Sequence, residues 1–130
     1  MSHDAHALRW LPLWLATGWL LVGAVVYLSL TPAPPEVDLP QGDKLAHVLA
    51  YAVLMFWFIQ IYEGARRRAL IAIGFVCLGI VLEFLQGYGG ARAFDAHDMI
   101  ANAAGVAIGW MSGPPRTSNV FVRIESLVSI

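Results

Sequence analysis

The stretch Leu11–Leu30 holds 20 residues without a charge, and it limits the folds open to this chain more than any other feature. A helix that crosses the hydrocarbon core of a bilayer needs about 20 apolar residues at 1.5 Å rise each. The composition agrees, because 58% of the residues are hydrophobic and 13% are charged, whereas soluble domains carry roughly 25% charged residues. A soluble fold of 130 residues has too little interior to bury so many apolar side chains. We therefore expect a membrane protein.

A cleaved signal peptide is the alternative explanation for this first stretch. We favour an uncleaved helix, because the apolar core is longer than that of a typical signal peptide and Leu28-Ser29-Leu30 is a poor cleavage site. Trp10 and Trp14 also suit the membrane interface, where tryptophan is enriched.

Three further apolar stretches predict three more helices. The four expected helices cover about 11–30, 44–62, 69–86 and 96–112. Prolines exclude a continuous helix over 31–43, and a glycine-containing loop is expected over 87–98. The last helix reaches spanning length only if it starts near Asp95 or if the membrane thins locally. We expect one domain, residues 1–115, that is an all-α integral membrane bundle of four transmembrane helices.

Basic residues set the expected orientation. They lie before the first helix, in the turn after the second and beyond the fourth, at Arg9, Arg66, Arg67, Arg68, Arg116 and Arg123. Cytoplasmic loops are enriched in Lys and Arg, so we expect an N-in/C-in, multi-pass protein of the cell inner (cytoplasmic) membrane. Residues 116–130 would form a cytoplasmic tail that is too short to span. A surface helix and a disordered end are both open for it.

Polar side chains of the last three helices are expected to gather at one edge of the membrane, the outer one. This follows because successive helices alternate in direction. The group comprises Asp43, Lys44, His47, Tyr51, Glu83, Gln86, Arg92, Asp95, His97, Asp98 and Asn102. Glu83 stands out, since it lies about one turn inside an apolar span, where an ionised carboxylate is costly. It needs a cation, strong hydrogen-bond donors or a proton.

Helical spacing predicts which of these groups share a face. Asp43, His47 and Tyr51 are four apart and form one stripe. Gly105 and Gly109 lie on the same face as Asn102 and form a small-xxx-small pair, which lets another helix approach closely. The partner on this face is left open between a helix of the same chain and a second copy, so an oligomer through these glycines is one of the two expectations.

At this point the chain resembles the VanZ-like family of membrane proteins, over roughly residues 40–112. The matching pattern reads Asp43-Lys44-Leu45-Ala46-His47 and Tyr51, then Glu83-Phe84-Leu85-Gln86, then Arg92, then Asp98, Asn102, Gly105 and Gly109. The resemblance implies a small multi-helix envelope protein. One member of the family is associated with resistance to glycopeptide antibiotics such as teicoplanin. No established reaction comes with the resemblance.

The first class of function that fits these residues is binding of an anionic or glycan-bearing envelope ligand, either a lipid or a glycopeptide. Lys44 and Arg92 would hold its negative groups. Asp95 and Asp98 would orient the arginine or sugar hydroxyls. The expected ligand-binding set is Asp43, Lys44, His47, Tyr51, Glu83, Gln86, Arg92, Asp98 and Asn102.

An intramembrane hydrolase or transferase acting on a lipid-linked envelope substrate is the second class. The candidate catalytic residues are His47, Glu83 and Asp98. His47 would act as the base with a carboxylate orienting it, and Arg92 would stabilise the developing charge. The same three candidates could form a metal site, which we rank third because the ligands come from three separate elements. We assign no metal ligands.

Several other functions are disfavoured. The formal net charge of −1 gives no reason to expect nucleic acid. No phosphate-binding loop, dinucleotide motif or CxxC motif is present, so no cofactor is expected. The lone Cys77 lies in an apolar stretch and is expected to have a packing role. A transporter is disfavoured because the inner halves of the last three helices offer no continuous polar path. Membrane lipids are the expected partners.

Overall fold

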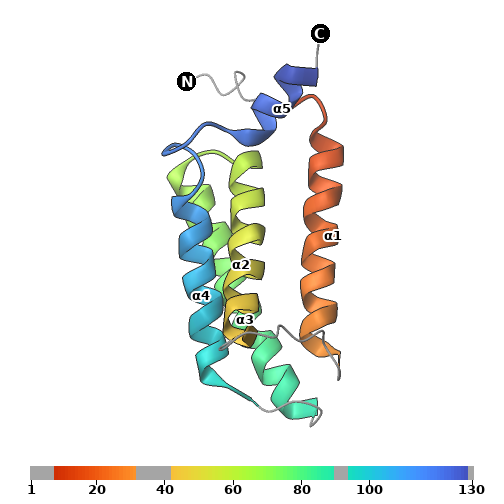
Figure 1. Cartoon of the computed structure of the whole chain (residues 1–130), viewed down its shortest axis with the longest axis vertical. Coiled ribbons are helices and arrows are strands. Elements are labelled where there is room, and N and C mark those ends of the chain that lie inside the picture. Colours follow the sequence, from red (N-terminus) through yellow and green to blue (C-terminus); the bar gives the residue numbers. More distant parts are fainter. Residues whose placement is uncertain (1–7, 32–41, 90–93, 129–130) are drawn as a thin grey trace.

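The computed structural model describes residues 8–31, 42–89 and 94–128, and this part of the chain forms five helices. They are α1 (Leu11–Leu30), α2 (Gly42–Ile61), α3 (Ala65–Gly89), α4 (Ala96–Met111) and α5 (Val120–Val128). Helices α1 to α4 run alongside one another, and α5 lies across the end of the bundle where α1 begins (Figure 1). The described residues contain no strand, and the predicted all-α class is confirmed.

Three helices, α1, α2 and α3, are long and apolar enough to cross a membrane. Helix α4 has 16 residues, and at 1.5 Å per residue it extends about 24 Å, short of the roughly 30 Å of a hydrocarbon core. The described residues therefore establish three candidate spans. Helix α3 begins at Ala65, four residues before the expected start at 69, because Gly64 takes the left-handed conformation (φ +91°) that makes the turn after α2. The arginine run consequently lies inside the first turn of α3.

The packing of α2 against α4 forms the centre of the bundle. A Cβ added to Gly105 would collide with the carbonyl oxygen of Val48, and one added to Gly109 would collide with that of Ala52. The two backbones therefore touch along this face, as small-xxx-small pairs permit. The sequence left open whether these glycines pack against a helix of the same chain or against a second copy. In the described residues they pack against α2 of the same chain.

Two buried polar side chains lie at the end of the bundle opposite to the one expected. Gln60 is 1% exposed and Arg68 is 7% exposed. The prediction that all strongly polar groups of these helices share one edge is therefore wrong. Arg68 donates to the carbonyl oxygens of Ile59 (3.0 Å) and Tyr62 (3.1 Å), which have no partner within their own helix at the end of α2.

Gln60 and Asn119 attach the last helix to this end. The Gln60 side-chain oxygen accepts from the backbone N–H of Val120 (2.8 Å), and Asn119 donates to the Gln60 carbonyl (2.7 Å). The Asn119 side-chain oxygen accepts from the N–H groups of Phe121 and Val122 and so caps the start of α5. Of the two states left open for the tail, disorder does not apply to residues 120–128, which form a helix.

Helix α5 also holds the start of α1. The buried Glu125 carboxylate accepts from the backbone N–H groups of Arg9 (2.8 Å) and Trp10 (2.9 Å) and from the Trp14 indole (2.7 Å). Phe121 stacks on Trp14 with ring centroids 4.0 Å apart. Burial by itself would raise the pKa of Glu125, but these donors outweigh it and lower the pKa below its usual value. A carboxylate is well placed there, because the start of a helix carries partial positive charge.

Substitution of Gly105 by alanine should destabilise the bundle. The added methyl group has no space against Val48, and overpacking of this kind costs about 1–3 kcal/mol. Thermal unfolding of the detergent-solubilised protein measures the loss. Gly23→Ala is the matched control, because nothing lies within 4 Å of a Cβ at that position. Equal stability of both variants would contradict the close contact of α2 and α4.

Candidate functional site at one end of the bundle

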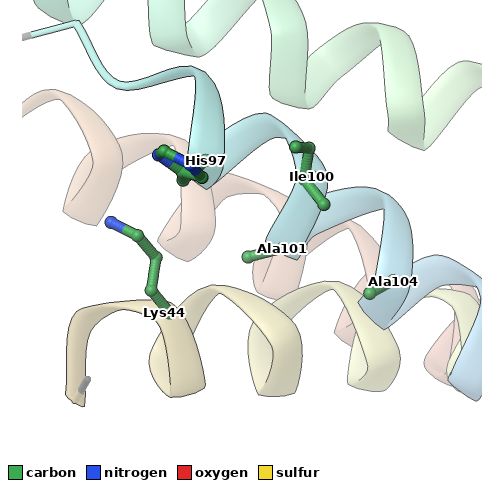
Figure 2. Close-up of a pocket in the computed structure, with 5 residues that line it drawn as sticks. All are labelled: Lys44, His97, Ile100, Ala101 and Ala104. Carbon is green, nitrogen blue, oxygen red and sulfur yellow. The ribbon is translucent and has the colours of Figure 1, made fainter. Parts of the chain in front are cut away.

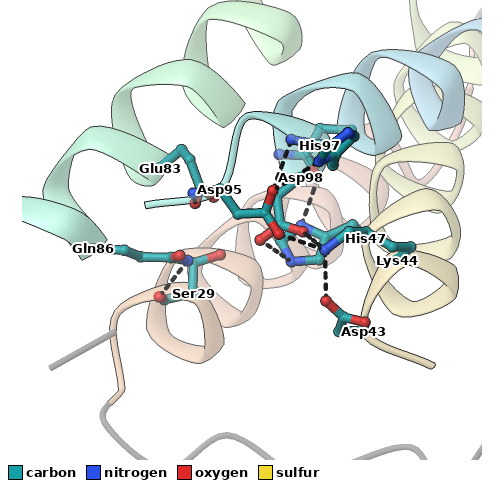
Figure 3. Close-up of polar contacts among 10 residues, drawn as sticks. Ser29, Asp43, Lys44, His47, Glu83, Gln86, Asp95, His97 and Asp98 are labelled. Atoms are coloured by element: carbon teal, nitrogen blue, oxygen red, sulfur yellow. Dashed lines mark hydrogen bonds and ion pairs between the residues drawn. The ribbon is translucent and has the colours of Figure 1, made fainter. Parts of the chain in front are cut away.

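Lys44 is the centre of a polar cluster at the end of the bundle away from α5. Its ammonium donates to one carboxylate oxygen each of Asp43, Asp95 and Asp98, all at 2.7 Å (Figure 3). The Lys44 side chain is 24% exposed and that of Asp98 is 8% exposed, whereas Asp43 is 64% exposed. The cluster therefore extends from the solvent-facing rim to the interior of the bundle.

The first turn of α4 supplies two of these carboxylates. Asp95 is the N-cap, with extended backbone, and its other oxygen accepts from the His97 N–H at 2.9 Å. Asp98 follows in the first turn, where a negative charge interacts favourably with the helix dipole. Lys44 first, and the His97 N–H second, stabilise the ionised form and lower the pKa of Asp95 below its usual value.

Glu83 fixes the start of α4 from the neighbouring helix α3. The residue is 1% exposed, and its carboxylate accepts from the backbone N–H of Asp95 at 2.7 Å. The sequence required a cation, strong donors or a proton for Glu83, and the described residues provide a strong backbone donor. The Lys44 ammonium is bound to the aspartates instead. Arg92 lies outside the described residues.

His47 is held between two residues of α4. Its Nδ1 lies 2.8 Å from the side-chain oxygen of Asn102, and its Nε2 lies 3.6 Å from a carboxylate oxygen of Asp98. An amide oxygen can only accept, so Nδ1 carries a proton in this contact and Nε2 points towards Asp98. Gly79 makes room for this arrangement, since a Cβ there would lie 2.8 Å from the Asn102 amide nitrogen.

Tyr51 and Gln86, also predicted for the site, are placed differently. Gln86 donates to the carbonyl oxygen of Ser29 at 2.7 Å and thereby joins α3 to the end of α1. Tyr51 is 2% exposed, and its hydroxyl has no hydrogen-bond partner among the described residues. Neither residue contacts the aspartates around Lys44 through a hydrogen bond among those residues.

The structure gives Asp95 a larger part than the sequence analysis did. It joins three elements. Its side chain binds Lys44 of α2 and caps α4, and its backbone N–H donates to the carboxylate of Glu83 in α3. An aspartate directly before an apolar helix is a signal for an N-cap, and that signal could have placed Asp95 in the ligand-binding set.

The cluster carries excess negative charge in the part of the chain that the structure describes. Four carboxylates, those of Asp43, Glu83, Asp95 and Asp98, stand against the single ammonium of Lys44. Oxygens of the three aspartates lie within 4.8 Å of one another, a spacing that suits a metal ion. The Lys44 ammonium already binds these three carboxylates. Among the described residues, the set His47, Glu83 and Asp98 that the sequence suggested for a metal does not form such a group.

A groove of about 470 Å³ begins beside this cluster and continues along α4. Figure 2 shows Lys44 and His97 at one end of the groove and Ile100, Ala101 and Ala104 along its length. Ile100 is 66% exposed, so the apolar part opens to the outside of the bundle. Charged and apolar surfaces thus meet in one depression between α2 and α4.

These features define a small helical membrane protein with three candidate spans and a cluster of charged side chains at one end of its bundle. The chain matches the model of the VanZ/LLP1 family over residues 7–114 and belongs to this family. It is also 33% identical over 85 residues to a Schizosaccharomyces pombe protein described as "Uncharacterized protein C11E3.10". That match covers 63% of this chain and 51% of the yeast protein, so the chain spans about half the length of this relative. No solved structure matches the chain.

Replacement of Lys44 by methionine should destabilise the cluster. It removes three charge-assisted hydrogen bonds and leaves three aspartates, one of them buried, facing one another. We expect a loss of about 1–2 kcal/mol, because the partial exposure of Lys44 lets solvent screen the charges. Thermal unfolding in detergent measures it. Adding Asp98→Asn to Lys44→Met should restore part of the stability, and Asp43→Asn alone should have little effect. An unchanged Lys44→Met protein would contradict this account.

Proposed function

We propose that the protein binds a lipid with a hydroxyl-rich head group, such as a glycan-bearing envelope lipid. The head group would lie against the polar cluster around Lys44, and the apolar chain would lie in the groove along α4. The observation that carries the proposal is the continuity of the groove, which joins Lys44 and His97 to Ile100, Ala101 and Ala104. The groove thus has a polar end and an apolar length, and a lipid likewise has a polar head group and an apolar chain.

The charge of the cluster favours a glycan over an anionic head group. Among the residues that the structure describes, three aspartates surround one ammonium, and this arrangement disfavours a phosphate or carboxylate. Sugar hydroxyls can donate to the free lone pairs of Asp43 and Asp95 and can accept from Lys44 or from His97, which is exposed. Of the two ligand classes that the sequence suggested, the glycan-bearing one therefore has the stronger support.

The proposal includes an orientation. The exposed arginines lie at the end of the bundle near α5, and the positive-inside rule would place that end in the cytoplasm of a cell with this protein in its inner membrane. The cluster around Lys44 would then face the outside. Helix α4 would serve as a short fourth span, because it packs along α2 and the bilayer can thin by a few ångströms around it.

An intramembrane hydrolase or transferase is the second candidate, and the geometry of His47 favours it. Asn102 fixes one ring nitrogen, and Nε2 is left 3.6 Å from Asp98, a distance too long for a strong hydrogen bond. A histidine oriented in this way can take a proton from a substrate hydroxyl or a water. Its partner would be Asn102 for orientation and Asp98 for charge, in place of the Glu83 that the sequence also suggested.

Native mass spectrometry of the protein purified from membranes tests the binding function. We expect a bound glycolipid that is lost in Ala101→Trp, because the indole fills the groove. Ala107→Trp, on the same helix beyond the groove lining, should retain the lipid. Absence of any glycolipid from the wild-type protein would contradict the proposal. The glycolipid is then added to the purified protein. If the wild-type protein converts it to a product, while His47→Ala binds it without converting it, the protein is an enzyme instead.

A further inference from the structure

The second surface of interest lies at the opposite end of the bundle, where the exposed arginines gather. Five of the six arginines at this end are exposed, namely Arg9, Arg66, Arg67, Arg116 and Arg123. They come from the starts of α1 and α3, the segment after α4, and α5. The acidic groups nearby among the described residues are Glu63 and the buried Glu125, whose carboxylate is occupied by the start of α1. The surface is therefore strongly positive.

Helix α5 adds an apolar stripe to this positive surface. Ile124, Leu127 and Val128 are 36%, 73% and 57% exposed. They follow the i, i+3, i+4 spacing that places side chains on one face of a helix. Phe121 and Glu125 face the bundle instead and are buried. Helix α5 thus has one side fixed to the protein, one apolar side that no described residue covers, and the exposed Arg123 beside it.

The position of α5 makes a bilayer the natural occupant of this stripe. Helix α5 crosses the end of the bundle next to the start of α1, which is a candidate membrane span (Figure 1). A helix at the end of a span lies at the level of the lipid head groups. Helices with an apolar face and flanking Lys or Arg bind in this interface, and the attraction to anionic lipids adds about 1 kcal/mol for each basic residue near the surface.

We propose that α5 and the surrounding arginines form a docking surface for anionic phospholipids. Ile124, Leu127 and Val128 enter the acyl region of the leaflet, and Arg116 and Arg123 bind lipid phosphates. Arg66 and Arg67 extend the same surface along the start of α3. This site is separate from the cluster around Lys44, and it stands whether or not the chain binds a glycolipid there.

Site-directed spin labelling tests the apolar part of the surface. The label is attached at Leu127→Cys in a Cys77→Ser background, since Cys77 is the sole cysteine, and the protein is placed in phosphatidylcholine vesicles with phosphatidylglycerol. We expect the label to be more accessible to oxygen than to a water-soluble nickel chelate. The matched label at Ser126→Cys, on the neighbouring polar side, should show the reverse. A label at 127 that is fully aqueous, or spin–spin broadening that reveals a second copy on the stripe, overturns the proposal.

Lipid preference tests the arginines. Native mass spectrometry of the reconstituted protein should find phosphatidylglycerol retained in preference to phosphatidylcholine. Each of Arg116→Gln and Arg123→Gln should reduce this preference about fivefold, whereas the lysine variants at both positions keep the charge and should retain it. Both arginines are exposed, so thermal stability should not change. Glutamine variants with the wild-type preference would overturn the proposal.

Discussion

The contact of one ammonium with three carboxylates organises the end of the bundle that carries the candidate site. Lys44 lies in the first turn of α2, where its positive charge is unfavourable to the helix dipole, and Asp43, Asp95 and Asp98 offset that cost. Two of the aspartates belong to the first turn of α4, so the same contact aligns the starts of the two most closely packed helices. Gly105 and Gly109 approach the backbone of α2 further along the same pair of helices, and the groove begins at Lys44.

The two ends of the bundle have opposite character. One end holds carboxylates around Lys44, beside an open groove along α4. The other holds exposed arginines and an amphipathic helix, while its buried polar groups, Gln60, Arg68 and Glu125, are all used to satisfy backbone atoms. Polar side chains inside a membrane protein are costly unless paired. In the described part of the chain, the buried polar groups at one end are paired mainly with backbone atoms, whereas three aspartates at the other end share one lysine.

The sequence predicted the helices well where apolar length decided them and poorly where a charge pattern did. Helix α1 has the expected bounds, but the run Arg66 to Arg68, expected in a turn, lies in α3 because the turn is made at Gly64. The alternating direction of the helices predicted that His47, Asp98 and Asn102 lie at the same edge, and the structure brings them together. The partner of Glu83 could not be predicted, because a backbone N–H carries no mark in the sequence. The burial of Gln60 depends on where α5 docks, which no local pattern reveals.

Glu125 links the start of α1 to a helix that lies more than one hundred residues later in the sequence. The start of α1 has no side-chain cap of its own, and its N–H groups and the Trp14 indole are satisfied by a carboxylate 111 to 116 positions later. During synthesis α1 must therefore enter the bilayer with these donors turned to water or lipid head groups. These contacts form only after α5 has been synthesised, so the start of α1 reaches its final position later than the helices between the two.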